Sequence, residues 1–168
     1  MKKFKLILAA LILTLGTTAM TAQTKIAHID AQQLIESMPE YKAAQTSLEK
    51  VQKSYETEIK AMMKELETKA RQYDGEAATK TDQENQKRIE EIQDMQNNIG
   101  AYRQQAMEDL DKKREDVFRP ILEKAQNAIQ KVGRAQGYHY VLDSTMGSGI
   151  ILADGKDLLP DVKKDMGI

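Results

Sequence analysis

Two long, charge-rich stretches with a recurring apolar stripe decide the fold. The first covers residues 40–73, EYKAAQTSLEKVQKSYETEIKAMMKELETKARQY, and the second covers residues 81–136, TDQENQKRIEEIQDMQNNIGAYRQQAMEDLDKKREDVFRPILEKAQNAIQKVGRAQ. Apolar residues recur in both at intervals that place them on one face of a helix. Acid-before-base pairs four positions apart, such as Glu49–Lys53, each add a few tenths of a kcal/mol to a helix in water. We therefore predict two long, largely solvated helices.

Capping signals mark where each helix begins. Ser37 and Glu40 are spaced as a capping box, and Pro39 between them suits a first helical turn, where its missing amide costs nothing. Thr81 and Glu84 form a second capping box at the start of the return helix. We expect both boxes to fix the N-terminal ends of the long helices.

Asp74-Gly75 lies between the two stretches and is predicted to be the turn. Gly75 suits a left-handed helix cap. A turn here folds the second helix back on the first, with Tyr55 near Ile99. At 1.5 Å per residue, a helix of about 34 residues gives an arm of roughly 50 Å.

The stripe between the two helices is interrupted, so the hairpin should be loosely zipped. Polar residues occupy seam positions at Gln52, Lys69, Gln96, Arg103 and Lys113. Gly100 costs about 1 kcal/mol relative to alanine inside a helix, and it is either a tolerated surface glycine or a point of bending. Pro120 removes one helical hydrogen bond and predicts a kink at 116–120. Gly100 and Pro120 are the candidate hinges.

Short strand-like runs flank the hairpin and predict a small body. They are residues 25–30, 138–143 and 149–153, with a hairpin turn around 146–149 and a terminal helix capped by Asp157. Such a body buries little apolar surface alone and leaves its strand edges open, so self-association is expected. The fold class is α+β. The association body comprises residues 23–39 and 120–168, the arm comprises residues 40–119, and a closed oligomer shares the β core.

The first 22 residues have the pattern of a secretory signal peptide. Lys2, Lys3 and Lys5 precede an apolar run at residues 6–15 and a small-residue stretch ending at Ala22, so we expect cleavage there and export. The chain has no cysteine, and removal of the three lysines changes its formal charge from −1 to −4. That charge does not favour nucleic-acid binding.

No residue pattern predicts catalysis, a metal site or a cofactor. His28 and His139 each fall in a predicted strand, and partly buried strand residues explain them better than a catalytic or metal role. The 147–149 Gly-Ser-Gly sequence lacks the Gly-Lys-Ser/Thr of a phosphate loop and reads as a turn. The chain is therefore not expected to be an enzyme.

Methionines and tyrosines along the arm are the candidate binding residues. Methionine adapts to varied apolar partners, although most of these side chains could simply pack the two helices together. Met63 and Tyr102 lie one position off the seam and are the better candidates for a face turned elsewhere. The candidate set is Met62, Met63, Met95, Tyr102 and Met107.

The order of segments resembles the OmpH/Skp family of periplasmic chaperones across essentially all of the mature chain. The matching segments, around the long hairpin, are Lys25-Ile-Ala-His-Ile-Asp30, Met38-Pro-Glu-Tyr-Lys42, Arg119-Pro-Ile-Leu122, Gly137-Tyr-His-Tyr-Val-Leu-Asp143 and the following Gly-Ile-Ile-Leu. Together these segments are fairly specific, whereas the hairpin alone would match many coiled coils.

The resemblance implies a periplasmic homotrimer whose three arms enclose a cavity. There it would hold unfolded outer-membrane proteins without ATP on their way to the outer membrane, with outer-membrane assembly machinery as a further potential partner. The arm candidates would contact these proteins. The trimer body would contain Ile26, Ile29, Val141, Leu142, Ile150 and Leu152.

The charge of the arm departs from the strongly basic arms of the best-known member. Residues 76–119 carry eleven acids and eight bases, and residues 40–74 carry seven of each. This balance argues against tight electrostatic binding to lipopolysaccharide or a membrane surface. The alternative function is a non-enzymatic coiled-coil spacer or adaptor in the cell envelope.

Overall fold

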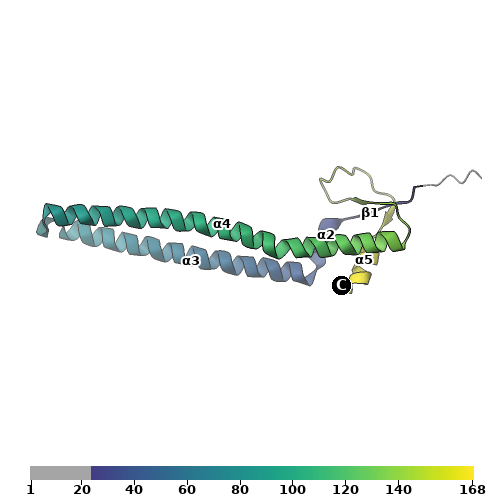
Figure 1. The fold of residues 1–168 in the computed structure, drawn as a ribbon, viewed down its shortest axis with the longest axis horizontal. Helices are drawn as coiled ribbons and strands as arrows, with labels where there is room; N and C mark the ends of the chain where they lie inside the picture. Colours follow the sequence, from purple (N-terminus) through teal and green to yellow (C-terminus); the bar gives the residue numbers. More distant parts are fainter. Residues whose placement is uncertain (1–23) are drawn as a thin grey trace, which may run out of the picture.

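The computed structural model describes residues 24–168, so the predicted signal peptide lies outside the described residues. Two long helices, α3 (Pro39–Glu76) and α4 (Asp82–Ala135), run side by side and form an arm. The arm projects from a small body at one end, where the C-terminus also lies (Figure 1). The predicted α+β class is confirmed as a mostly helical chain with a small sheet.

The turn at the tip of the arm lies later than predicted. The helix α3 continues through Asp74 and Gly75, and Gly75 is not among the glycines with positive φ. A short 3-10 helix, η1 (Ala77–Thr79), makes the turn, and the Asn85 side chain donates a 3.0 Å hydrogen bond to the Ala77 carbonyl. The prediction of a left-handed Gly75 cap was wrong, because the helical hydrogen bonds of α3 outweigh the modest cost of one glycine.

The later turn changes which residues face each other across the arm. Tyr55 packs against Tyr102, with ring centroids 5.9 Å apart, about one helical turn beyond the predicted partner Ile99. The start of α4 was predicted correctly: the Thr81 side chain accepts from the Glu84 amide while the Glu84 carboxylate accepts from the Thr81 amide. This capping box satisfies amides that have no partner within the helix.

A short helix that the sequence did not predict precedes the arm. It is α2 (Ala31–Ser37), and the Asp30 carboxylate caps it by accepting a 2.8 Å hydrogen bond from the Gln33 amide. Ser37 therefore ends α2, where its hydroxyl donates to the Leu34 carbonyl, and does not cap α3 as predicted. Pro39 occupies the first turn of α3, as predicted.

The sheet contains three parallel strands in the order β2-β1-β3. They are β1 (Ile26–Ile29), β2 (Tyr140–Asp143) and β3 (Lys156–Asp157). In the register, Ile26 pairs with Tyr140, and β3 begins opposite Ala27. The first two strands match the prediction.

The predicted third strand at residues 149–153 is wrong. This stretch lies in a long loop, residues 144–155, which we call the apolar loop. The predicted hairpin with a turn around 146–149 is also wrong, because β2 and β3 each pair with β1, in parallel, and not with each other. Gly147 and Gly149 adopt positive φ and allow the loop to reverse its direction.

The core lies where the root of α4 crosses the sheet and meets α2 and α5 (Leu159–Met166). Small residues on α4 permit this close approach: a Cβ added at Gly133 would lie 2.9 Å from Val141 Cγ2. The core residues are Ala27, Ile29, Leu34, Met38, Ala44, Ile121, Ala125, Ala128, Val132, Leu158, Leu159 and Val162.

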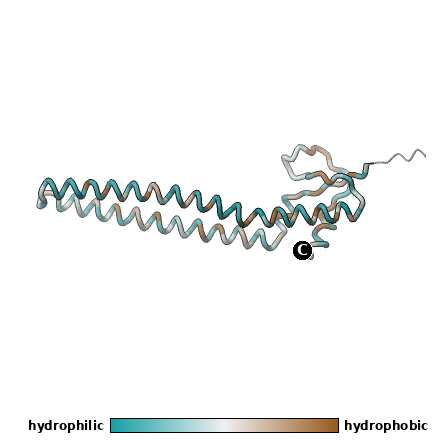
Figure 2. Tube along the Cα trace, viewed as in Figure 1, coloured by the Kyte–Doolittle hydropathy of each residue, from teal (hydrophilic) through white to brown (hydrophobic). Residues whose placement is uncertain are grey.

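Hydropathy separates the body from the arm. Apolar colouring gathers in the body and on the apolar loop, whereas much of the arm is hydrophilic (Figure 2). Within residues 24–168, no helix combines the length and the apolar character needed to cross a membrane. Because much of the arm is hydrophilic, a narrow apolar seam and polar contacts hold its two helices together.

Candidate functional site

Few side chains are buried between the two helices of the arm. Away from its root, the described arm residues that are buried are Ile99 and Ala106 on α4. Most of the other apolar seam residues are half-buried, as expected for two helices that pack without a third partner. The arm therefore exposes most of its side chains, and its shape depends on local clamps.

A polar clamp joins the two helices near the tip. The Glu91 carboxylate accepts hydrogen bonds from both Lys69 and Tyr73. The Arg88 guanidinium stacks over the Tyr73 ring, 4.5 Å from its centroid, and also pairs with Glu76. The hydrogen bond from Lys69 holds the pKa of Glu91 below its ordinary value of 4.5, with Tyr73 adding to the effect. Lys69, predicted as a break in the seam, thus contributes a contact across it.

A tyrosine pair connects the helices farther toward the body. Tyr55 donates a 3.1 Å hydrogen bond to Asp109, and Tyr102 donates to Glu58. The hydrogen bond to Glu58 raises the pKa of Tyr102 to about 12. Tyr102 was a candidate binding residue. Here its ring packs within the arm and its hydroxyl is already engaged.

The candidate methionines have different environments. Met63 and Met107 are 47% and 63% exposed, whereas Met62 and Met95 are half-buried in the arm. The sulfur of Met63 accepts a 2.9 Å contact from the Arg103 guanidinium. Met63 and Met107 are therefore the members of the set that present most apolar surface to solvent.

Sequence reasoning missed an exposed apolar position near the tip. Ile89, predicted as a seam residue, is exposed and lines a hollow of about 380 Å³ together with Ile92, Ala70 and Ala77. The apolar periodicity of α4 predicted a seam position for Ile89, whereas in the structure its side chain is exposed at a hollow that residues of both helices line.

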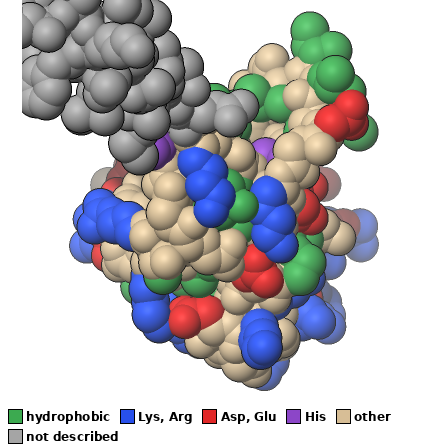
Figure 3. All heavy atoms as spheres, turned by 90° about the vertical axis from the view of Figure 1, so that its right-hand side faces the viewer, with side chains coloured by type: hydrophobic (Ala, Val, Ile, Leu, Met, Phe, Trp, Pro, Cys, Tyr) green, Lys and Arg blue, Asp and Glu red, His purple; other side chains and the backbone are tan. Residues whose placement is uncertain are grey.

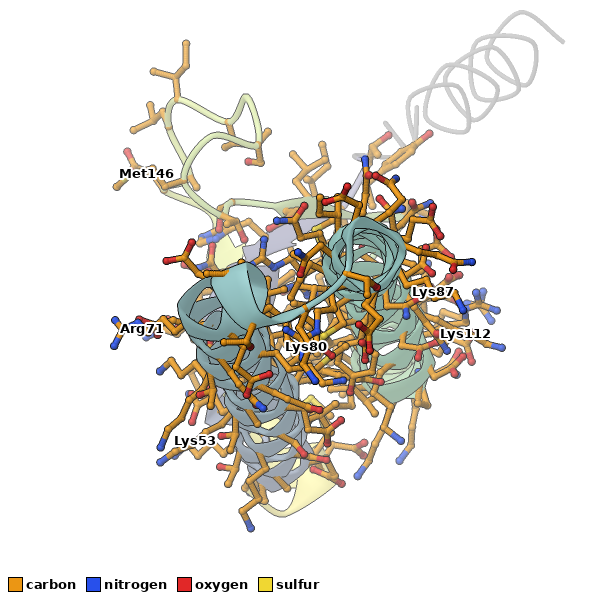
Figure 4. All side chains as sticks on the ribbon, turned by 90° about the vertical axis from the view of Figure 1, so that its left-hand side faces the viewer. Lys53, Arg71, Lys80, Lys87, Lys112 and Met146 are labelled. Carbon is orange, nitrogen blue, oxygen red and sulfur yellow. The ribbon has the colours of Figure 1, made fainter. Side chains whose placement is uncertain are left out.

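Charged side chains surround the arm. Viewed along the arm from its tip, Lys53, Arg71, Lys87 and Lys112 point outward in several directions, and Lys80 lies at the turn (Figure 4). This distribution agrees with the nearly equal numbers of acids and bases in the sequence. In the described chain, no group of three or more His, Cys, Asp and Glu residues is arranged to hold a metal ion.

The apolar loop is the most exposed apolar part of the body. Met146 is 98% exposed, Leu152 is 74% exposed, and Ile151 is fully exposed. The loop projects from the body, as seen from the body end in Figure 3, and Met146 lies on it away from the arm helices in Figure 4. Ten successive residues, 144–153, carry no charge.

The residues predicted for the oligomer body fall into two groups. Ile29 is 2% exposed and Val141 is half-buried, so both support the fold of one chain. The other four present apolar surface to solvent, and these are Ile26, Leu142, Ile150 and Leu152.

The comparisons with known proteins agree with this architecture. A model of the family described as "Outer membrane protein (OmpH-like)" matches residues 25–166. The chain belongs to the OmpH-like family. The family predicted from the order of sequence segments is therefore confirmed. No curated protein matches it.

A solved OmpH-like structure shares the fold. The crystal structure of a candidate outer membrane chaperone (OmpH-like) from Caulobacter crescentus CB15 superposes with a TM-score of 0.76 at 16% identity. The match covers 86% of this chain and 85% of the other. The small body with one long helical arm is thus an arrangement that the two OmpH-like chains share.

Proposed function

We propose that this OmpH-like protein is a periplasmic holdase chaperone that works without ATP. It binds unfolded outer-membrane proteins, here called clients, and prevents their aggregation during transit to the outer membrane. The observation that carries this proposal is the projecting two-helix arm with exposed apolar side chains, in a member of the OmpH-like family. Such an arm offers many weak contacts along its length and needs no catalytic group.

The proposed client surface combines Met63 and Met107 with Ile89 near the tip. These side chains are exposed on an arm whose charged groups are nearly balanced. An unfolded chain of either net charge can therefore approach, while apolar contacts hold it weakly. Met62, Met95 and Tyr102 would contribute less unless the helices separate, since their surfaces pack within the arm.

The proposed assembly is a homotrimer formed through the body. Its support is the apolar surface left exposed at Ile26, Leu142 and the apolar loop, together with two open sheet edges at β2 and β3. Open edges and exposed apolar loops favour association with another chain. Three arms would then stand around a shared space that one arm alone cannot enclose. Outer-membrane assembly machinery would be the partner that receives the client.

Membrane and lipopolysaccharide contacts are not part of the proposal. Strong binding to anionic lipid requires a clustered basic surface, and each basic residue near the membrane contributes about 1 kcal/mol. The arm sequence instead has a small excess of acids.

An envelope spacer or adaptor is the alternative. A spacer would hold a folded partner through a continuous apolar stripe. In this arm, polar contacts at Lys69–Glu91 and Glu58–Tyr102 interrupt the apolar surface between the helices. Interrupted apolar surface favours transient contacts over a fixed docking site.

The proposal is tested by diluting a urea-unfolded outer-membrane β-barrel protein into buffer without ATP. Light scattering follows aggregation with the purified full-length protein present. We expect scattering to fall as the protein is added, and to reach a plateau at a fixed ratio of assembly to client. Scattering that equals the value with the same mass of an inert protein would contradict the proposal.

A further inference from the structure

Two exposed methionines of the arm flank one arginine. Met107 follows Arg103 by four residues on α4, so the two side chains lie on the same face of that helix. Arg103 also reaches across to α3, where its guanidinium donates a 2.9 Å hydrogen bond to the sulfur of Met63. Because Met63 is 47% exposed and Met107 is 63% exposed, both thioethers are open to small solutes in water.

The exposed apolar surface and the polar clamps lie on different sides of the arm. Ile89 precedes Met107 by 18 residues, or about five turns of α-helix, so both lie on the same face of α4. Tyr102 precedes Met107 by five residues, which places the two side chains about 140° apart around the helix. Tyr102 and Glu91 both bond to charged side chains of α3. The arm is therefore clamped by polar contacts on one side and leaves methionine sulfur exposed on the other.

The surroundings of Met63 suit an oxidised sulfur better than a reduced one. Methionine supplies all the sulfur of this chain, which has no cysteine. A thioether accepts hydrogen bonds only weakly, whereas a methionine sulfoxide is polar and carries an oxygen acceptor. Within residues 24–168, Arg103 forms no ion pair, and its guanidinium is directed at the Met63 sulfur. A charged donor is thus already in place for an oxygen added to that sulfur.

We propose that Met63 is a site of reversible oxidation, at which Arg103 holds the sulfoxide and the modified arm binds clients less tightly. Oxidation turns a flexible apolar side chain into a polar one, so the client loses an apolar contact. At the same time, the sulfoxide oxygen occupies the Arg103 guanidinium. The proposal rests on the client-holding function proposed above and assigns a regulation to the same surface.

Hydrogen peroxide is the oxidant in this step. A lone pair of the Met63 sulfur attacks one peroxide oxygen, so that the S–O bond forms as the O–O bond breaks. The departing hydroxide takes the proton of the transferred oxygen and leaves as water. The sulfur loses two electrons and the peroxide gains them. The exposed Arg103 side chain moves back to accommodate the oxygen and donates to it, and methionine sulfoxide reductases restore the thioether.

The site is tested first by the rate of oxidation at each methionine. The folded full-length protein is treated with hydrogen peroxide for increasing times, and peptide mass spectrometry follows the gain of oxygen. Met63 should be oxidised faster than its neighbour Met62, which is half-buried between the helices, and Met38 in the core should be oxidised last. Equal rates at Met62 and Met63 would overturn the site.

The role of Arg103 is tested by unfolding temperature. In a background with Met107→Leu and Met146→Leu, Met63 is the most exposed methionine of residues 24–168. Oxidation should shift the unfolding temperature of this protein upward, relative to its effect in the same background with Arg103→Ala. We expect a difference of about 2–4 °C between the two shifts, as one modest hydrogen bond gives in a chain of this length.

Arg114→Ala is the matched control, because Arg114 is an exposed arginine of α4 that pairs with Asp111 on its own helix. It should respond to peroxide as the background protein does. Equal shifts with Arg103 and with Arg103→Ala would overturn the role of Arg103.

The effect on clients is measured in the same background, before oxidation, after oxidation and after treatment with a methionine sulfoxide reductase. The amount of protein needed to suppress aggregation should rise about two- to tenfold on oxidation, the factor for loss of one methionine contact. It should return to its starting value on reduction. Unchanged or improved suppression, with Met63 fully oxidised, would overturn the regulation.

The outcomes separate this regulation from the function on which it rests. A protein that suppresses no aggregation even before oxidation would overturn the proposed function and the regulation together. The oxidation rates and unfolding temperatures would still decide whether Arg103 holds a sulfoxide at Met63.

Discussion

The Nδ1 atom of His28 lies 3.1 Å from the Oγ atom of Ser144. The other ring nitrogen of His28, Nε2, lies 3.3 Å from the carbonyl oxygen of Gly155. One side chain on the central strand therefore contacts both ends of the apolar loop. The backbone adds to this arrangement, since the Ser144 amide donates to the Ile29 carbonyl at 2.8 Å.

Replacement of His28 should loosen the apolar loop. His28→Ala removes both side-chain hydrogen bonds, and each is worth about 1 kcal/mol. The two losses together correspond to a factor of about 30, so we expect amide hydrogen exchange at Ser148 to become about thirtyfold faster, while the β1–β2 pairing is kept. His139→Ala is the control, because His139 contacts Lys25 and does not touch the loop. Equal exchange in His28→Ala and wild type would show that the loop holds its shape without His28.

Substitutions of exposed loop residues should test assembly more clearly than substitutions of strand residues, because they do not disturb the packing of a single chain. Val141→Asp would disturb the packing of a single chain, because Val141 lies against Gly133. Ile150→Asp and Ile151→Asp place a charge on the loop, which is tolerated in water but not in an apolar interface. We expect these loop variants to keep their helical circular dichroism and to have monomer mass by light scattering. An oligomer mass equal to that of wild type would contradict the assembly.

Acid should weaken the clamp at the tip of the arm. The pKa of Glu91 is lower in the folded chain than its ordinary value of 4.5, so its contribution to stability is present above that pH. The contribution is lost as pH falls through the lowered pKa. Wild type should therefore unfold at a higher temperature than Glu91→Gln at pH 7, and the difference between the two should shrink as the pH falls below 4.5.

Glu90→Gln is a suitable control for this experiment. Glu90 is an exposed neighbour on the same helix, and it accepts a hydrogen bond from Gln86 on its own helix rather than from α3. Its substitution should shift the unfolding temperature little at either pH. A difference in unfolding temperature between wild type and Glu91→Gln that stays constant as the pH falls below 4.5 would contradict the charge-assisted clamp.

Two glycine-to-alanine substitutions in α4 should have opposite effects. A Cβ at Gly100 meets nothing within 4 Å, so Gly100→Ala should stabilise the helix by up to about 1 kcal/mol. A Cβ at Gly133 would lie 2.9 Å from Val141 Cγ2, so Gly133→Ala should destabilise the body by about 1–3 kcal/mol. Urea unfolding measures both effects, and shifts of the same sign would contradict the packing described here.

The hinge role of Gly100 requires a separate measurement. If the arm bends there, Gly100→Ala should slow hydrogen exchange of residues 95–105 and leave the oligomer mass unchanged. Exchange rates equal to those of wild type would leave Gly100 as a tolerated surface glycine. Pro120 also lies inside α4, which continues across it. Its role as a second hinge stays a prediction.

The elements that the sequence predicted well carry strong local signals. The Thr81 capping box and the long apolar periodicity depend on residues within a few turns of each other, so they defined α4 and the hairpin. The tip was misplaced because a single glycine was given more weight than the helical sequence around it. Helix α2 was missed because its cap, Asp30, was read as the end of a strand.

The sheet was harder to predict because its pairing is not local. Residues 149–153 are apolar and suit a strand by composition, yet β3 is the polar pair Lys156–Asp157 opposite Ala27 and His28. The environments of the candidate arm residues were hard to predict for a similar reason. Exposure of Ile89 and engagement of Tyr102 both depend on the register across the arm, which the position of the turn sets.

The central claim is that the arm holds unfolded clients, and photocrosslinking tests it most directly. A photoreactive residue replaces Met63 or Met107 on the arm, or Lys164 on α5 as the control position. Each full-length protein is illuminated with an outer-membrane β-barrel protein in its unfolded or folded form. The account predicts crosslinks from both arm positions to the unfolded protein, with few to the folded form and few from Lys164. Equal crosslinking from all three positions, or crosslinks to the folded protein alone, would contradict it.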